Sequence, residues 1–197
     1  EEWIQHIGEF SIICARKPNG EISSFPMSKN HHINHILYSS TAPTEIDAKI
    51  EKEGCYLGKS IAEKLNVVGL ISIEFFLNKD NKLIVNEMAP RPHNSGHYTI
   101  DACFTSQFEQ HIRAITELPF GSTKIHTPAV MINLLGDLWN KGVPSWESIL
   151  KDSRTKLHLY NKKIARPGRK MGHFTLLDSN LGIAQKDSEK LFLSLKE

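Results

Sequence analysis

The sequence predicts an α+β fold for this chain of 197 residues. Three observations lead to that prediction. Apolar runs typical of strands come in pairs around turn signals, two long segments repeat their apolar residues at roughly helical spacing, and a second strand-rich region follows a connector rich in Gly, Ser, Thr and Pro. The composition is that of a globular protein, since 40% of the residues are hydrophobic and 23% are charged.

The individual elements follow from local composition and spacing. Strands are predicted at residues 10–16, 22–25, 33–40, 67–77, 83–88, 129–135, 157–160 and 172–177. Helices are predicted at residues 44–65, 105–118, 146–150 and 188–195. Thr44 is the expected N-cap of the first helix. The connector at residues 119–128 predicts a boundary between a domain of residues 1–120 and a small β-rich domain of residues 121–197.

Charge and cysteine usage argue against several functional classes. A formal net charge of +2 lacks the basic excess of a nucleic-acid-binding surface, so no nucleic-acid partner is expected. No membrane partner is expected either, because no apolar run is long enough to span a bilayer and the first residues do not resemble a secretory leader. Three cysteines without a CxxC pair predict reduced thiols rather than a zinc site, which indicates a cytoplasmic protein.

A predicted hairpin places two glutamates opposite each other. A turn symmetric about residues 80–81 pairs residue 77 with residue 84, and the same register pairs Glu74 with Glu87. Directly opposed residues have Cβ atoms about 4.5–5.5 Å apart, and like charges at that separation repel each other. A divalent cation relieves such repulsion, and Mg²⁺ is commonly held by one or two carboxylates together with substrate phosphates. The alternative is a pair of solvated glutamates on an exposed face.

Residues 86–97 concentrate polar side chains around two prolines and a glycine. Buried polar groups need hydrogen-bond partners, so an apolar core does not require this density of them. Pro90 and Pro92 favour extended backbone before them, which holds Arg91 and His93 out from the chain. Arginine suits bidentate contact with a carboxylate-like or phosphate-like anion. The alternative is a rigid surface loop with incidental histidines.

A second cluster contains five basic residues around a Pro-Gly pair, namely Lys162, Lys163, Arg166, Arg169 and Lys170. A solvated basic turn is the common structure of such a run. The functional alternative is a phosphate clamp, because a tight turn at Pro167-Gly168 can bring Lys162 and Arg169 to one point.

Several segments together resemble the ATP-grasp superfamily and, more narrowly, the 5-(carboxyamino)imidazole ribonucleotide synthases, the ATPase subunits of phosphoribosylaminoimidazole carboxylase. The resembling segments are residues 1–4, 8–11, 69–75, 85–99, 106–111, 131–134 and 166–173, in the family's order. The resemblance implies the C-terminal lobe of an ATP-grasp fold, followed by a small β-rich domain. It also implies that the N-terminal half of the enzyme is missing from this chain and that the complete enzyme is a homodimer.

The resemblance further implies an ATP- and Mg²⁺-dependent ligase of de novo purine biosynthesis. In that reaction ATP phosphorylates bicarbonate, and the carboxyphosphate formed carboxylates the amine of 5-aminoimidazole ribonucleotide. The metal ligands implied are Glu74 and Glu87, and the nucleotide-binding residues implied are Glu1, Glu2, Trp3, Ile4, Glu9, His32, Asn86 and Glu87. The residues implied for the bicarbonate and imidazole pocket are Arg91, His93, Asn94 and Ser95, and those for the 5′-phosphate are Lys162 and Arg169.

Two other functions fit part of the same pattern. Another ATP-grasp ligase of purine synthesis, such as a formate-dependent formyltransferase, would also use Glu74 and Glu87. The loop at residues 93–97 and the basic segment at residues 166–170 favour the carboxylating enzyme. The second alternative is a non-catalytic nucleotide-binding module, which has no need of the carboxylate pair. We expect the chain alone to be inactive, because phosphoryl transfer requires a nucleotide that is gripped from both sides.

Overall fold

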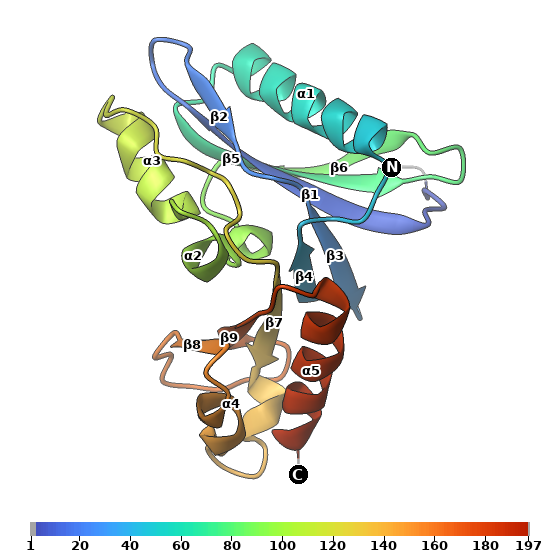
Figure 1. Cartoon of the computed structure of the whole chain (residues 1–197), viewed down its shortest axis with the longest axis vertical. Helices are drawn as coiled ribbons and strands as arrows, with labels where there is room; N and C mark the ends of the chain where they lie inside the picture. Colours follow the sequence, from blue (N-terminus) through green and yellow to red (C-terminus); the bar gives the residue numbers. More distant parts are fainter. Residues whose placement is uncertain (1–2, 197) are drawn as a thin grey trace.

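A computed structural model describes residues 3–196 and shows one twisted sheet with helices packed on it (Figure 1). The strands are β1 (Gly8–Arg16), β2 (Ile22–Ser24), β3 (Ser28–Ile33), β4 (Ile36–Ala42), β5 (Gly69–Leu77), β6 (Leu83–Ala89), β7 (Ala129–Leu135), β8 (Thr155–Leu159) and β9 (Lys170–Leu177). The helices are α1 (Ala48–Lys64), α2 (Thr99–Ala102), α3 (Gln107–Ile115), α4 (Glu147–Lys151) and α5 (Leu181–Ser194), with 3₁₀ turns at Asn94–Gly96 and Gly136–Trp139. The α+β prediction is confirmed.

The strands are antiparallel and follow the order β6-β5-β1-β3-β4-β7-β9-β8, with β2 paired to the end of β1. The pairing of β4 with β7 places Ser39 opposite Ile132. In Figure 1, β1, β2, β5 and β6 lie with α1 and α3 in the upper part, β3 and β4 lie in the middle, and β7 to β9 lie with α4 and α5 in the lower part. The boundary near residue 120 stays a prediction, because the sheet continues across it.

Strand β1 is covered on both faces, which explains its continuous apolar run. Ile12 and Cys14 pack in one core cluster with residues of α1, whereas Ile13 and Ala15 pack in another with residues of α2 and α3. Successive side chains of a strand point to opposite faces, so one apolar run serves two cores. A third core cluster joins β7 and β9 to α4 and α5.

Helix α1 packs closely on β1 because it carries a glycine at the contact. A Cβ atom at Gly58 would lie 2.8 Å from Cγ2 of Ile12. The helix begins at Ala48, and the side chain of Asp47 accepts a hydrogen bond from the backbone N–H of Lys49 at 2.7 Å. The prediction of Thr44 as N-cap is therefore wrong, since the carboxylate of Asp47 satisfies one of the free N–H groups in the first turn.

The strand predicted at residues 33–40 is confirmed over residues 36–40, which belong to β4, but the chain turns at residues 34–35 and residue 33 ends β3. Asn34 and His35 adopt positive φ angles of 50° and 61°, a conformation that Asn and His tolerate better than most residues. Residues on either side form the β3–β4 hairpin. Two predicted helices are confirmed with different bounds: α3 is shorter than residues 105–118, and α5 begins at Leu181, upstream of residue 188.

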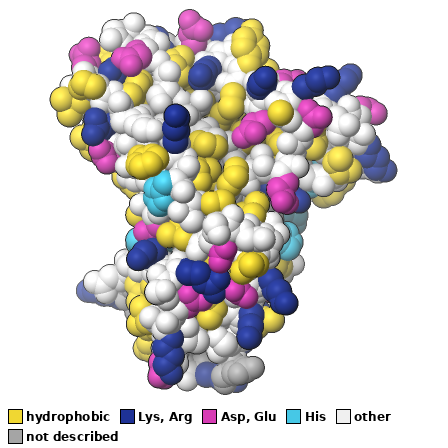
Figure 2. All heavy atoms as spheres, in the orientation of Figure 1, with side chains coloured by type: hydrophobic (Ala, Val, Ile, Leu, Met, Phe, Trp, Pro, Cys, Tyr) yellow, Lys and Arg dark blue, Asp and Glu magenta, His cyan; other side chains and the backbone are white. Residues whose placement is uncertain are grey.

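The surface mixes charges of both signs. On the face shown in Figure 2, acidic and basic side chains alternate with hydrophobic ones, in keeping with the small net charge. Within residues 3–196, none of the helices combines the length and the hydropathy that a membrane crossing requires.

Candidate active site

A pocket of about 570 Å³ opens beside β5 and β6 and contains many of the predicted nucleotide and metal residues. Its lining residues are Trp3, His6, Glu9, His32, Asn34, His35, Glu74, Phe76, Asn86 and Glu87. Trp3 is 82% exposed, whereas Ile4 is not among the lining residues. Glu1 and Glu2 lie outside the described residues.

The carboxylate pair forms as predicted, although the register that produces it differs. Glu74 pairs directly with Glu87, but Leu77 pairs with Leu83, so the prediction that residue 77 faces residue 84 is wrong. The turn closes between Asn78 and Lys82, whose backbone atoms are hydrogen-bonded at 3.0 Å. A β-bulge next to Glu74 then shifts the register by one residue.

The extra residue of this bulge is Asn86. Phe75 pairs with Val85 and Glu74 pairs with Glu87, so Asn86 has no counterpart on β5. Bulges bend the strand and redirect side chains near functional sites. Here the bulge brings Asn86 and Glu87 together into the lining of the pocket.

Electrostatics in the pocket disfavour the charged form of Glu74. Burial raises the pKa of its carboxyl group, and the nearby carboxylates of Glu87 and Glu9 raise it further. The charges of His32 and Lys170 lower the same pKa. A cation held between Glu74 and Glu87 would reverse this effect by favouring both ionised forms. The residues present therefore fit a divalent cation bound by oxygen ligands.

Glu9 is held between two histidines. Its Oε2 lies 2.7 Å from Nδ1 of His32, and its Oε1 lies 3.6 Å from Nε2 of His6. The ring of His6 stacks on Phe76 with a centroid distance of 4.3 Å. These contacts fix the direction of the Glu9 carboxylate before any ligand arrives.

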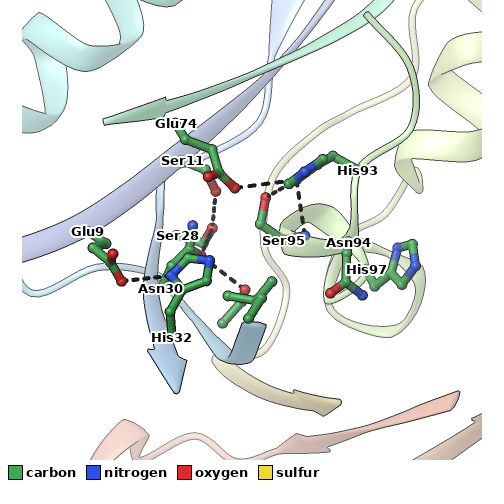
Figure 3. A network of polar contacts seen from close by, with 12 residues as sticks. Glu9, Ser11, Ser28, Asn30, His32, Glu74, His93, Asn94, Ser95 and His97 are labelled. Carbon is green, nitrogen blue, oxygen red and sulfur yellow. Dashed lines mark hydrogen bonds and ion pairs between the residues drawn. The ribbon is translucent and has the colours of Figure 1, made fainter. Parts of the chain in front are cut away.

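A layer of buried polar side chains lies between Glu9 and residues 91–97 (Figure 3). We call residues 91–97 the substrate loop because of the role that the resemblance predicts for them. Ser11 of β1 is opposite both Glu74 of β5 and Ser28 of β3. The hydroxyls of Ser11 and Ser28 lie 2.9 Å apart, and Asn30 accepts from Ser40 at 3.0 Å. Side chains of one face recur at every second residue, so Glu9 and Ser11 share the face that the loop covers.

The substrate loop is anchored by Gln107, the first residue of α3. The backbone N–H of His93 donates to Oε1 of Gln107 at 2.9 Å, and Nε2 of Gln107 donates to the carbonyl of His93 at 2.8 Å. The same Nε2 lies 3.0 Å from Nδ1 of His97. Gln107 is fully buried, so these bonds are protected from water.

His93 is a neutral ring at neutral pH. Burial lowers its pKa to about 4, and the positive charges of Arg91 and Lys170 act in the same direction. Nδ1 of His93 shares a 2.9 Å hydrogen bond with Oγ of Ser95. The same atom lies 3.7 Å from Oε1 of Glu74 (Figure 3).

Asn94 and Ser95 are engaged inside the protein. Asn94 exchanges two hydrogen bonds of 2.9 and 2.6 Å with Asn133 on β7, and Asn133 also donates to the carbonyl of Leu37 at 2.8 Å. Ser95 is 0% exposed. In this structure Asn94 therefore ties the loop to the sheet, while Arg91 is exposed and donates to the carbonyl of Pro92.

The basic cluster forms the predicted turn. Gly168 has a φ of 72°, and the N–H of Arg169 donates to the carbonyl of Arg166 at 3.0 Å. Lys162 donates to the carbonyl of Lys170 at 2.6 Å, and Arg169 donates to that of Ile164 at 2.9 Å. Both proposed phosphate ligands are therefore positioned by backbone carbonyls of the same segment.

Three residues of the site were missed by sequence reasoning, namely His6, Gln107 and Asn133. Lys170 was named in the basic cluster, but its interaction with Glu74 was not predicted. Lys170 connects the basic cluster to the carboxylate pair, because its ammonium group interacts with the carboxylate of Glu74. Burial lowers the pKa of Lys170, and the charge of Glu74 raises it. Asn133 could have been identified from the sequence, because it is a polar residue in the middle of an apolar strand. Gln107 offered none that separates it from an ordinary residue at a helix start.

Comparison with known proteins identifies the family. Residues 1–108 match the ATP-grasp domain, and residues 129–187 match the C-terminal domain of phosphoribosylaminoimidazole carboxylase. The chain belongs to the ATP-grasp family. The prediction of the C-terminal lobe of an ATP-grasp fold followed by a small domain is confirmed, and that domain is of the carboxylase type.

Several relatives of this ATP-grasp protein are named enzymes. The N5-carboxyaminoimidazole ribonucleotide synthase of Bacillus subtilis is 48% identical over 90% of this chain and 46% of the relative. The phosphoribosylaminoimidazole carboxylase of Candida albicans is 38% identical over 94% of this chain and 34% of the relative. The chain therefore spans about half the length of the Bacillus relative and a third of the Candida one.

Solved structures of the same family superpose well on the chain. The N5-carboxyaminoimidazole ribonucleotide synthetase of Thermus thermophilus has a TM-score of 0.91 and 36% identity, covering 100% of this chain and 53% of its own. The Aspergillus clavatus enzyme, solved in complex with ADP and 5-aminoimidazole ribonucleotide, has a TM-score of 0.87 and 31% identity, covering 99% of this chain and 53% of its own.

Proposed function

We propose that this chain is the C-terminal half of an ATP-dependent ligase that carboxylates 5-aminoimidazole ribonucleotide with bicarbonate, through carboxyphosphate, in de novo purine biosynthesis. The observation that carries the proposal is one pocket that contains the carboxylate pair, Glu9, His32 and Asn86 and lies next to the loop of His93. The names of the relatives support the same reaction.

In this proposal Glu74 and Glu87 hold Mg²⁺. The ion would supply positive charge against the phosphates of ATP. The two carboxylates are suited to that role because they are directly paired and the charged form of Glu74 is disfavoured without a cation. Asn86, which the bulge places beside them, contributes an amide to the nucleotide side of the pocket.

The adenosine end of ATP is assigned to the N-terminal segment. Residues 1–4 contact adenine in this proposal, with Trp3 beside the pocket and Ile4 adjacent to it in the chain. Glu9 accepts hydrogen bonds from the ribose hydroxyls. Its carboxylate is already oriented by His32 and His6, so little ordering remains when the nucleotide binds.

The reacting groups are assigned to the substrate loop. Arg91 provides an exposed guanidinium for bicarbonate. His93 stays neutral and can accept a proton or a hydrogen bond at neutral pH, while Asn94 and Ser95 hold the loop in place. Lys162 and Arg169 bind the 5′-phosphate of the ribonucleotide. Closure of the site in the complete enzyme would exclude water and so protect a labile carboxyphosphate.

The complete enzyme contains an N-terminal half that grips the nucleotide from the other side, works in the cytoplasm and forms a homodimer in this proposal. A formate-dependent formyltransferase also fits the carboxylate pair, but the match of residues 129–187 to the carboxylase C-terminal domain favours carboxylation. A module without turnover does not require the paired carboxylates.

The test uses the complete enzyme with ATP and Mg²⁺. We expect ADP release to require both bicarbonate and 5-aminoimidazole ribonucleotide, and the carboxylated product to appear in step with ADP. Turnover with formate in place of bicarbonate would favour the formyltransferase. Nucleotide binding without any turnover would overturn the enzyme proposal in favour of a binding module.

A further inference from the structure

Asp101 of α2, His158 of β8 and His173 of β9 converge outside the nucleotide pocket. One donor atom of each residue lies within 4.8 Å of the other two. Nε2 of His158 is 2.8 Å from Oδ2 of Asp101, and the two imidazole rings have centroids 4.6 Å apart. The residues lie far apart in the sequence, so only the packing of the three elements creates this cluster.

His173 has an unused nitrogen in the protein interior. The residue is 1% exposed, and its Nε2 has no hydrogen-bond partner within the part of the chain that the structure describes. Its Nδ1 lies 2.8 Å from the hydroxyl of Tyr160. When Nδ1–H donates to that hydroxyl, the lone pair of the ring is on Nε2, which is the arrangement that orients a histidine for a metal.

We propose that Asp101, His158 and His173 bind a divalent transition ion, with Zn²⁺ as the best match. Two imidazoles and one carboxylate suit Zn²⁺, whereas Mg²⁺ prefers oxygen ligands only. The ion takes the place of the hydrogen bond between Asp101 and His158, and the buried ring of His173 offers a nitrogen that no described residue occupies.

The geometry requires modest movement. A tetrahedral ion with bonds of about 2.1 Å holds its ligand atoms about 3.4 Å apart. The contact between Asp101 and His158 therefore opens from 2.8 Å, and the widest pair of donor atoms closes from within 4.8 Å. The side chain of His158 is 31% exposed, which leaves an open side for a water molecule as the fourth ligand.

The site joins two parts of the chain that match different family models. Asp101 lies in the part that matches the ATP-grasp domain, and His158 and His173 lie in the carboxylase-type C-terminal domain. A bound ion therefore cross-links the helix after the substrate loop to the strands on either side of the basic cluster. This role is structural and independent of the proposed reaction.

The experiment measures metal binding and not turnover. The complete protein, free of affinity tags and stripped with a chelator, is titrated with ZnCl₂ by calorimetry and with CoCl₂ by visible absorption. We expect one equivalent to bind and Co²⁺ to show the absorption of a low-coordinate site. His158→Gln and Asp101→Asn should each weaken binding by more than about ten-fold.

Two controls separate this site from others. His126→Gln removes an exposed histidine whose Nδ1 bonds to the adjacent Thr127, and Glu87→Gln alters the carboxylate pair; both should leave the Zn²⁺ affinity unchanged. Zn²⁺ should also raise the Tm of the wild-type protein but not that of His158→Gln. Lack of stoichiometric binding, or equal affinity in His158→Gln, would overturn the proposal and leave the cluster as a hydrogen-bonded network only.

Discussion

Oε1 of Glu74 lies 3.7 Å from Nδ1 of His93, so the carboxylate pair and the substrate loop meet at one contact. Glu74 belongs to the proposed metal site and His93 to the proposed substrate site. A neutral His93 beside a carboxylate forms no ion pair at neutral pH, because its pKa is lowered to about 4. The two sites are therefore neighbours in space without neutralising each other, which leaves Glu74 available for a cation.

Replacement of Glu87 by glutamine should abolish Mg²⁺-dependent ATP turnover in the complete enzyme. The variant removes one of two carboxylates from a directly opposed pair, and a neutral amide is a weaker ligand for Mg²⁺. Phosphate release and thermal unfolding measure activity and fold. Glu63→Gln, on the exposed side of α1, is the matched control and should remain active. Activity of Glu87→Gln close to that of the wild type would contradict the assignment.

Arg169→Ala should raise the KM for 5-aminoimidazole ribonucleotide by roughly ten- to a hundred-fold, because a charge-assisted hydrogen bond contributes about 1.5–3 kcal/mol. The KM for ATP should change little. Steady-state kinetics with each substrate varied in turn measures the difference. Arg166→Ala removes an exposed neighbour of the same charge and serves as control. An equal effect on both substrates would remove Arg169 from the phosphate clamp.

The chain of 197 residues should not catalyse the reaction by itself. It contributes the carboxylate pair and the substrate loop, whereas phosphoryl transfer needs phosphates held from both sides. The fragment and the complete enzyme are assayed together with ATP, Mg²⁺, bicarbonate and 5-aminoimidazole ribonucleotide. Activity that returns when the N-terminal half is added would support the prediction. Turnover by the fragment within ten-fold of the complete enzyme would show that these groups suffice.

Gln107→Leu should destabilise the protein by about 2 kcal/mol or more. The substitution leaves the backbone N–H and carbonyl of His93 without their present partners in a buried setting, and each such group costs about 1–3 kcal/mol. Urea unfolding measures the free energy. Gln185→Leu, at an exposed position of α5, should change stability by less than about 0.5 kcal/mol. A similarly small effect at Gln107 would mean that the loop is held by other contacts.

The free energy of unfolding should fall as the pH drops from about 6.5 towards 4. Burial lowers the pKa of His93 and of His97 to about 4, so the unfolded chain binds protons in this window that the folded protein does not. Glu74, whose pKa is raised, acts in the opposite direction, so Glu74→Gln should steepen the fall. Denaturant unfolding at several pH values measures the slope, and stability that is flat or rises on acidification would contradict it.

Sequence pattern alone was sufficient for the local features of this protein. The hairpin of β5 and β6, the strand β7 and the turn at Pro167-Gly168 follow from short-range preferences that each segment carries in itself. The family was recognised by resemblance, chiefly through residues 85–99 and 166–173, and the family matches of residues 1–108 and 129–187 confirm it.

The tertiary structure alone decided the register and the anchors. Glu74 faces Glu87 only because a turn one residue shorter than predicted and a bulge shift the pairing in opposite directions, and a bulge has no clear signature in one sequence. Gln107, Asn133 and the cluster at His173 act through partners that include His93, 14 residues from Gln107, and Leu37, 96 residues from Asn133. Asp101 and His173 are 72 residues apart. Such contacts depend on how elements pack, and local propensity contains no information about packing partners.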